Sequence, residues 1–160
     1  MRRIATQRLR RRWSCSPCCG ATREAVQACG DLTGKIVIDC TNPLKADFTG
    51  LDVGHTTSGA EQVASWASGA RVFKAMNQVG SNLRDDPKAP GGQPVMFAAG
   101  GADGKAEVMG LVRELGFDTI DAGDLVIARL LKPYAMLWIH PALRRGFGRD
   151  IAFALLRERR

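Results

Sequence analysis

Short apolar runs alternate with amphipathic stretches along most of this 160-residue chain. Residues 36–40, 71–75 and 95–99 read IVIDC, RVFKA and VMFAA, and each run is apolar on both faces apart from one or two positions. Runs of this kind are typical of strands that helices cover on both sides, as in parallel sheets. Because such strands alternate here with helical patterns, the sequence predicts an α/β fold built on a parallel sheet.

Helical patterns fill most of the chain between and after these strands. Ser58 and Glu61 form an S-x-x-E capping box at the start of one helix. Apolar residues recur at the spacing of a buried helix face across residues 103–115. Pro141 is expected to separate two final helices. The expected elements are helices over 21–29, 58–67, 103–115, 125–140 and 142–159, a last strand over 119–121, and an irregular segment over 76–93.

The formal net charge of +7 belongs to the start of the chain. Residues 1–23 contain seven arginines and no acid, and the remaining 16 basic residues balance the 16 acidic ones. Three interpretations of this start are open: a transit peptide, a small nucleic-acid patch, or a segment without evolved structure. Residues 1–19 show neither helical nor strand periodicity, which favours the third interpretation and disfavours nucleic-acid binding. We expect this segment to be disordered.

Composition excludes several classes of protein. No apolar run approaches the roughly 18–20 residues of a membrane span. Five cysteines, with no secretory signal pattern, favour a reducing cytoplasm. The pair Cys15 and Cys18 lacks the second C-x-x-C that a structural zinc site requires. We therefore expect a cytoplasmic protein without a metal site or a membrane segment.

Polar and small residues follow each predicted buried strand. In sheets of this type ligands bind beyond the carboxyl ends of the strands. Three segments are placed there: residues 41–43 (TNP), 76–82 (MNQVGSN) and 100–103 (GGAD). For Asn42 a plain turn role is favoured, because Asn-Pro is itself a turn signal. For Asn77 a turn role and a ligand role remain equally open, since its loop is unusually long.

Motifs for acid, base or nucleophilic chemistry are missing from the sequence. The segment from Gly100 to Lys105 departs from a phosphate loop, because Ala99 replaces its first glycine and Ala106 the serine or threonine. No G-x-G-x-x-G loop occurs in the 160 residues. The sequence therefore indicates no catalytic side chain.

Four segments together resemble a known family. They are GDLTGKIVIDCTNPL, FTGLDVGHTTSGAEQVASWASGARVFKAMNQVGS, PVMFAAG and ELGFDTIDAGDL with the later ARLLKPYAMLWIH. They are similar to the NADPH-dependent reductases of the deazaflavin coenzyme F-420. The resemblance implies a Rossmann-type domain, a helical C-terminal region, NADP and coenzyme F-420 as cofactors, and hydride transfer between their rings.

The resemblance also implies roles for individual residues. Those near the nicotinamide ribose would be Thr41, Asn42 and Pro43, and those where the two rings meet would be Ala75, Met76, Asn77 and Val79. The helical region behind the deazaflavin would contain Leu130, Leu131, Met136 and Trp138, most of them simple core residues. The chain departs from the family at Met76, where Phe is expected, and at Lys132, where Glu is expected.

The family resemblance begins near residue 20 and lacks the first strand–helix units of the family. The fold expected is therefore α/β, a partial Rossmann-like parallel sheet without those units, plus C-terminal helices. Its expected divisions are a basic tail over 1–19, the rear of an NADP-binding domain over 20–124, and a helical region over 125–160.

Two functions follow from this N-terminally truncated pattern. One is an NADPH-dependent reductase whose activity needs the missing glycine-rich loop, with imines as alternative acceptors. The other is a non-catalytic interaction module or a fragment that a partner completes. An exposed sheet edge and the helical C-terminus favour a homodimer in either case.

Overall fold

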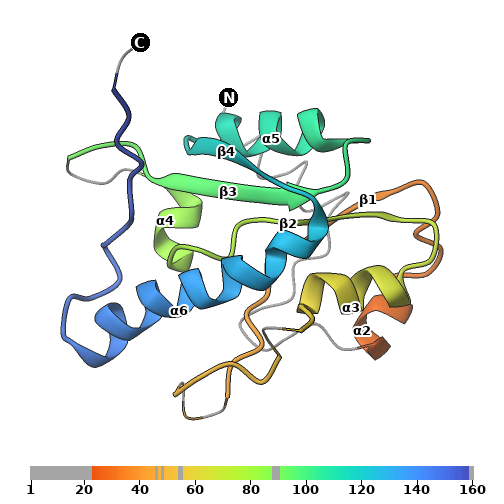
Figure 1. Ribbon diagram of the computed structural model, residues 1–160, viewed down its shortest axis with the longest axis horizontal. Helices are drawn as coiled ribbons and strands as arrows, with labels where there is room; N and C mark the ends of the chain where they lie inside the picture. Colours follow the sequence, from red (N-terminus) through yellow and green to blue (C-terminus); the bar gives the residue numbers. More distant parts are fainter. Residues whose placement is uncertain (1–22, 46, 48, 54–55, 88–90, 159–160) are drawn as a thin grey trace.

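A computed structural model describes residues 23–45, 47, 49–53, 56–87 and 91–158 (Figure 1). The predicted disordered tail over 1–19 lies outside these residues. The strands are β1 (Ile36–Asp39), β2 (Arg71–Lys74), β3 (Val95–Gly100) and β4 (Asp118–Gly123). The helices are α2 (Arg23–Gln27), α3 (Gly59–Trp66), α4 (Ser81–Asp85), α5 (Lys105–Glu114), the 3-10 turn η1 (Leu125–Ile127) and α6 (Ala128–Arg144). The α/β class and all four predicted strands are therefore confirmed.

The four strands lie side by side in the order β1-β2-β3-β4. Strands β1 and β2 are parallel, as are β3 and β4, but β2 and β3 pair antiparallel through Phe73 with Gly100 and Lys74 with Ala99. The sheet is thus mostly parallel and Rossmann-like, with one reversal at its centre. The reversal follows from the connection between β2 and β3, which keeps the chain at the edge where β2 ends, so that β3 runs back beside β2 without a parallel crossover.

Side chains from successive strand positions bury on opposite faces of this sheet. Val37 and Val72 pack on the face covered by α2 and α3, together with Val63. Ile38 and Phe73, the next residues along each strand, join the core under α5. Figure 1 shows α5 on one side of the sheet and α3 and α6 on the other. This two-sided burial explains why the strands are apolar at nearly every position.

The start of α3 follows the predicted capping box. The Ser58 hydroxyl accepts a hydrogen bond of 3.1 Å from the Glu61 amide, which satisfies one of the free N–H groups of the first turn. The Glu61 carboxylate turns to Arg129 on α6, with Nη2–Oε1 and Nε–Oε2 distances of 2.6 and 3.0 Å. The cap therefore forms, and Glu61 also joins two helices.

The C-terminal region contains one long helix instead of the two that were predicted. Helix α6 runs without a break through Pro133 and Pro141 and ends at Arg144. Its apolar side stays buried along the whole length, and this packing outweighs the hydrogen bonds that the prolines cannot donate. Residues 145–158 are not helical, so the predicted helix over 142–159 is wrong. Gly146 and Gly148, both at positive φ, turn the chain away from α6.

The segment after α6 passes the starts of β3 and β4 in an extended form. The Phe153 carbonyl accepts a 2.9 Å hydrogen bond from the Val95 amide at the start of β3. The Trp138 indole donates to the Ile151 carbonyl at 2.6 Å. These contacts place the C-terminal segment beside α6 and the start of β3 (Figure 1). In the part of the chain that the structure describes, no helix has the length and apolar character to cross a bilayer.

Candidate functional site

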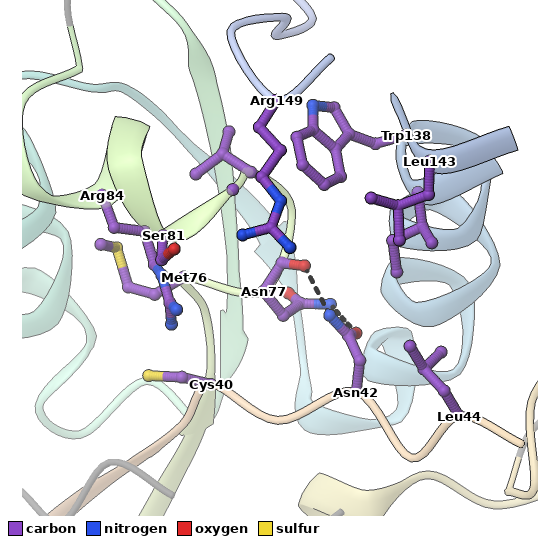
Figure 2. Close-up of a pocket in the computed structure, with 13 residues that line it drawn as sticks. Cys40, Asn42, Leu44, Met76, Asn77, Ser81, Arg84, Trp138, Leu143 and Arg149 are labelled. Atoms are coloured by element: carbon purple, nitrogen blue, oxygen red, sulfur yellow. Dashed lines mark hydrogen bonds between the residues drawn. The ribbon is translucent and has the colours of Figure 1, made fainter. Parts of the chain in front are cut away.

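The carboxyl ends of β1 and β2 are joined by a pair of asparagines. The Asn42 side-chain amide donates to the Asn77 carbonyl at 2.8 Å, and the Asn77 amide donates back to Asn42 Oδ1 at 3.1 Å. Figure 2 shows the two side chains facing each other across the space between the strands. Because β1 and β2 are parallel, the residues that follow them meet at one edge of the sheet, as the sequence predicts.

Further amide contacts hold Asn77 in one orientation. Its side chain also donates to the Leu131 carbonyl on α6 at 3.1 Å and accepts from the Gln78 amide at 3.2 Å. Gln78 in turn pairs with the Phe97 backbone, donating at 2.8 Å and accepting at 2.9 Å. Because Asn77 and Gln78 are buried and fully bonded, this network fixes β2, β3 and α6 relative to one another.

A pocket of about 190 Å³ opens beside the asparagine pair (Figure 2). Its lining residues come from the loops after β1 and β2, from α4 and α6, and from the C-terminal segment: Cys40, Asn42, Leu44, Met76, Asn77, Val79, Gly80, Ser81, Arg84, Trp138, Ile139, Leu143 and Arg149. Four of the seven predicted cofactor residues, Asn42, Met76, Asn77 and Val79, are among them. The pocket thus combines apolar side chains with a few fixed amides, the usual composition of a small-molecule site.

The other predicted residues lie behind this pocket wall. Thr41 is 3% exposed and donates through its amide and hydroxyl to Asp39 Oδ1 at 2.9 and 2.7 Å. Ala75 is fully buried, and Pro43 is buried next to Asn42. Their side chains support the loops after β1 and β2. In the helical region Trp138 lines the pocket and Leu131 is buried, while Leu130 is 64% exposed and points away from the core.

Met76 has an unusual backbone at the pocket wall. Its φ is +62°, the only positive φ among the described non-glycine residues. A left-handed conformation is disfavoured for a residue with a side chain, and such strain concentrates at functional sites. The conformation follows directly on β2 and directs the chain into the loop that carries Asn77. The predicted departure from the family at Met76 therefore falls on a strained residue that lines the pocket.

The third predicted ligand segment does not belong to this edge. Because β3 runs against β2, the residues after β3 lie at the start of β2, at the opposite end of the sheet. Asp103 there forms an ion pair of 3.1 Å with Arg71. The placement of residues 100–103 beside Asn42 and Asn77 is therefore wrong, and the antiparallel pair is the reason.

A buried group of charges lies directly behind the loops, and the sequence analysis did not identify it. Lys74 donates to Asp39 Oδ2 at 2.9 Å and to the Thr41 carbonyl, and both charged side chains are fully buried. Asp39 and Lys74 are paired residues at the ends of β1 and β2. The sequence did contain a signal for this pair, because Asp39 and Lys74 are charged residues that each end an otherwise apolar strand.

Lys132 adds to this group a second buried ammonium, which has no hydrogen-bond acceptor among the described residues. Its side chain is fully buried on α6, and Nζ is the one buried side-chain nitrogen or oxygen in the described residues without a hydrogen bond. A Cβ on Gly59 would lie 2.9 Å from this nitrogen, so a side chain there would require the end of the Lys132 side chain to shift. Burial, followed by the charge of Lys74, lowers the pKa of Lys132 to about 8. The departure that the resemblance predicts at residue 132 would thus change the charge of a buried cluster.

In the described parts of the chain, no group of three or more His, Cys, Asp or Glu side chains could hold a metal ion. The residues that line the pocket supply amides, guanidinium groups, the Cys40 thiol, the Ser81 hydroxyl and apolar surface. Such groups bind and orient a ligand.

The mostly parallel sheet, its covering helices and the pocket beyond β1 and β2 define a Rossmann-like α/β protein. No family model matches the chain. A curated relative, the metalloreductase STEAP3 of Rattus norvegicus, is 30% identical over 98 residues, or 61% of this chain. The chain spans 19% of the length of that relative.

Solved structures give a more complete match. A protein from Arthrobacter sp. FB24 that was assigned as an F-420-dependent NADP reductase superposes with a TM-score of 0.81 at 31% identity. The match covers 96% of this chain and 73% of the Arthrobacter chain. The chain therefore belongs to the same family of NADP reductases as the Arthrobacter protein, in agreement with the resemblance in its motifs.

More distant structures share the fold alone. The protein SMa0349 of Sinorhizobium meliloti superposes with a TM-score of 0.63 at 23% identity. A reductive aminase of Aspergillus terreus in complex with NADPH superposes with a TM-score of 0.54 at 24% identity, over 84% of this chain and 42% of the aminase.

Proposed function

We propose that this chain forms the nicotinamide and acceptor end of an NADP-dependent reductase that transfers hydride between NADPH and a deazaflavin coenzyme. The observation that carries the proposal is the Asn42–Asn77 pair beside the pocket. It fixes two loops at the carboxyl edge of a Rossmann-like sheet, where such folds bind dinucleotides. The similarity to the Arthrobacter reductase supports the choice of NADP and F-420.

The hydride transfer assigned to this site depends on how the two cofactors are positioned more than on reactive side chains. The cofactors would supply the hydride and accept it, so the protein has to hold two rings face to face and exclude water. Met76, Val79 and Trp138 offer apolar contact for a ring, and Asn42, which Asn77 holds in place, offers a fixed polar group for an amide or a ribose. This assignment agrees with the lack of a triad or dyad in the sequence.

The dinucleotide phosphates need groups that these 160 residues do not supply in the usual form. A Rossmann domain binds the pyrophosphate with a glycine-rich loop at a helix N-terminus, and no G-x-G-x-x-G occurs in the sequence. We therefore expect weak NADPH binding and no measurable reductase activity from the 160-residue chain alone. A thermal melt tests this expectation: strong binding, at 100 times the Kd, adds about 2.7 kcal/mol and roughly 5–10 °C.

A chimera tests the function of the pocket itself. The front of the Arthrobacter reductase, with its first strand–helix units, would be joined to residues 20–160 of this chain. We expect this chimera to oxidise NADPH with coenzyme F-420, and the same chimera with Asn42→Asp and Asn77→Asp to lose that reaction. The matched control is Gln27→Glu, the same chemical change at an exposed position of α2. Transfer to an imine but not to F-420 would show that the acceptor is wrong.

A second candidate function is a partner-completed or purely interacting module. In the described residues β1 pairs only with β2, so its outer edge has no strand beside it. Exposed strand edges bind other chains through backbone hydrogen bonds. If this function holds, the purified chain elutes as a complex or dimer. A proline at Ile36, whose N–H faces away from β2, disrupts the association, while a proline at the exposed Gln93 does not.

A further inference from the structure

Two arginines enter the candidate pocket from separate elements. Arg84 comes from α4 and Arg149 from the segment after α6, and both line the pocket together with Asn77. Figure 2 shows the two side chains on the same side of the pocket, with the Arg149 guanidinium directed towards Asn77. Residues 65 positions apart in the sequence thus bring two positive charges to one cavity.

The two charges are not balanced inside the pocket. None of the thirteen lining residues that the structure describes is acidic. Neither guanidinium has an ion pair with another described side chain, in contrast to Arg71, Arg129 and Arg157, which all pair with carboxylates. A pocket with two such guanidinium groups is electrostatically complementary to an anion, and guanidinium groups bind carboxylates and phosphates through paired hydrogen bonds.

The backbone around Arg149 is held in place by contacts that do not involve its charge. The Asn82 amide donates to the Arg149 carbonyl at 3.3 Å and to Asp150 Oδ1 at 2.6 Å. The indole of Trp138 bonds to Ile151 two residues further on, at 2.6 Å. Asp150, the nearest acid in the sequence, is thus bonded to Asn82. The segment is therefore anchored beside α4 with the Arg149 side chain left for a ligand.

A close contact also fixes α4, the helix that carries Arg84, against α6. A Cβ on Gly80, which precedes α4, would lie 3.0 Å from Trp138 and 2.5 Å from Asn82 Oδ1. The absence of a side chain at Gly80 allows α4 to approach the indole. The spacing of Arg84 and Arg149 is consequently set by packing before any ligand binds, which lowers the entropic cost of forming an anion site.

We propose that Arg84 and Arg149 form an anion-binding subsite for the hydride acceptor, selecting an acceptor whose ring system carries a phosphate or carboxylate side chain. The inference rests on the proposed function for the position of the ring, next to Met76 and Asn77. It goes further by naming the two residues that recognise the acidic side chain of the acceptor. The same anionic chemistry is present in the phosphates of NADPH, and the experiment separates the two sources.

The test uses the full 160-residue chain without NADPH and requires no reaction. Binding is measured by isothermal titration for two matched pairs of ligands: coenzyme F-420 with the same deazaflavin bearing an uncharged ribityl chain, and FMN with riboflavin. Each pair shares one ring and differs in its acidic group. We expect the wild-type chain to bind the acidic member at least about 10-fold more tightly in one or both pairs, with the ratio falling as salt is added.

The Arg84→Gln and Arg149→Gln variants identify the source of this preference. We expect the double variant to bind both members of a pair equally, with the affinity for the uncharged member unchanged. The matched control is Arg145→Gln, which removes a nearby exposed arginine that does not line the pocket. A thermal melt verifies that each variant is folded.

Several outcomes would overturn the inference. These are a failure of the wild-type chain to bind either acidic ligand, equal binding of both members in both pairs, or a preference that persists in the double variant. A double variant that weakens NADPH binding but keeps the acceptor ratio would assign the arginines to the nucleotide instead. Failure of the proposed function is a separate result, since the chimera could lack hydride transfer while the charge preference remains.

Discussion

The Lys74 ammonium and the Asp39 carboxylate form a buried ion pair at 2.9 Å, directly behind the two loops that carry the candidate site. Lys132 adds a second buried ammonium to the same region without a hydrogen-bond acceptor. Two cations against one anion are unfavourable in a medium of low polarity, because an unpaired buried charge loses its hydration. The site is therefore built on a cluster with an excess positive charge.

Replacing Lys132 should stabilise the protein. Lys132→Met removes the unpaired ammonium and retains an unbranched side chain of similar volume. We expect the free energy of unfolding at pH 7 to rise by about 1–3 kcal/mol, measured by urea denaturation. No change, or a loss of stability, would mean that Lys132 has a partner in solution.

Replacing Lys74 in the same way should have the opposite effect. Lys74→Met leaves the Asp39 carboxylate buried beside an apolar side chain and removes the donor to the Thr41 carbonyl. We expect a loss of about 3–5 kcal/mol, because breaking a buried pair leaves an uncompensated charge. The two lysines are both fully buried, so each variant is the control for the other. Equal effects would contradict the assigned pairing.

The stability of the protein should rise with pH above about 8. Burial and Lys74 lower the pKa of Lys132 from its usual 10.5 to about 8 in the folded state. Between these values the unfolded chain binds more protons, so the free energy of unfolding increases with pH, whereas below pH 8 the full penalty remains. We expect the advantage of Lys132→Met over wild type to shrink by about 1–2 kcal/mol between pH 7 and about 9.5. A constant difference across this range would exclude titration of Lys132 as the cause.

Asn77 should be sensitive to loss of its donor group alone. Asn77→Asp keeps the size of the side chain but replaces the amide that donates to Asn42 Oδ1 and the Leu131 carbonyl. We expect a loss of about 2–3 kcal/mol, since buried acceptors then face a carboxylate. Gln27→Glu on the exposed side of α2 makes the same chemical change and should alter stability by less than about 0.5 kcal/mol. Comparable losses of stability in the two variants would contradict a structural role for the asparagine pair.

Gly100 should tolerate no side chain. A Cβ there would lie 2.1 Å from Phe73 Cδ1, in the antiparallel contact between β2 and β3. We expect Gly100→Ala to destabilise the protein by about 1–3 kcal/mol. A Cβ on Gly110, in the middle of α5, would have no atom within 4 Å, so Gly110→Ala should stabilise the protein by about 0.5–1 kcal/mol. Thermal melts of the two variants should shift in opposite directions, and a neutral Gly100→Ala would argue against the antiparallel pairing.

Much of the fold was predictable because its signals are local. The four strands were found from short apolar runs, and the start of α3 was found from Ser58 and Glu61, whose hydrogen bond depends on a spacing of three residues. Helix α4 was missed because its five residues, SNLRD, show too little periodicity to stand out. The break at Pro141 was predicted wrongly, since burial of Trp138, Ile139 and Ala142 holds the helix together across it.

The candidate site was predictable only in part. Asn42, Met76, Asn77 and Val79 follow buried strands, and that position alone places them at a sheet edge. Arg84 and Arg149 carry no such signal, because their proximity depends on the turn at Gly146 and Gly148 and on the bond from Trp138 to Ile151. The family resemblance likewise marked Lys132 as a departure but could not show that its ammonium is buried without a partner.

The sequence by itself determined the class of fold, the strands and the loop residues that meet beyond β1 and β2, since these depend on hydrophobic periodicity and on parallel pairing of neighbouring strands. Tertiary structure alone decided the reversal between β2 and β3, the continuity of α6, the buried charges at Asp39, Lys74 and Lys132, and the meeting of Arg84 with Arg149. The physical reason is the separation along the sequence over which each interaction acts. Strand and cap signals act over a few residues, whereas burial and charge pairing depend on which distant segments pack together.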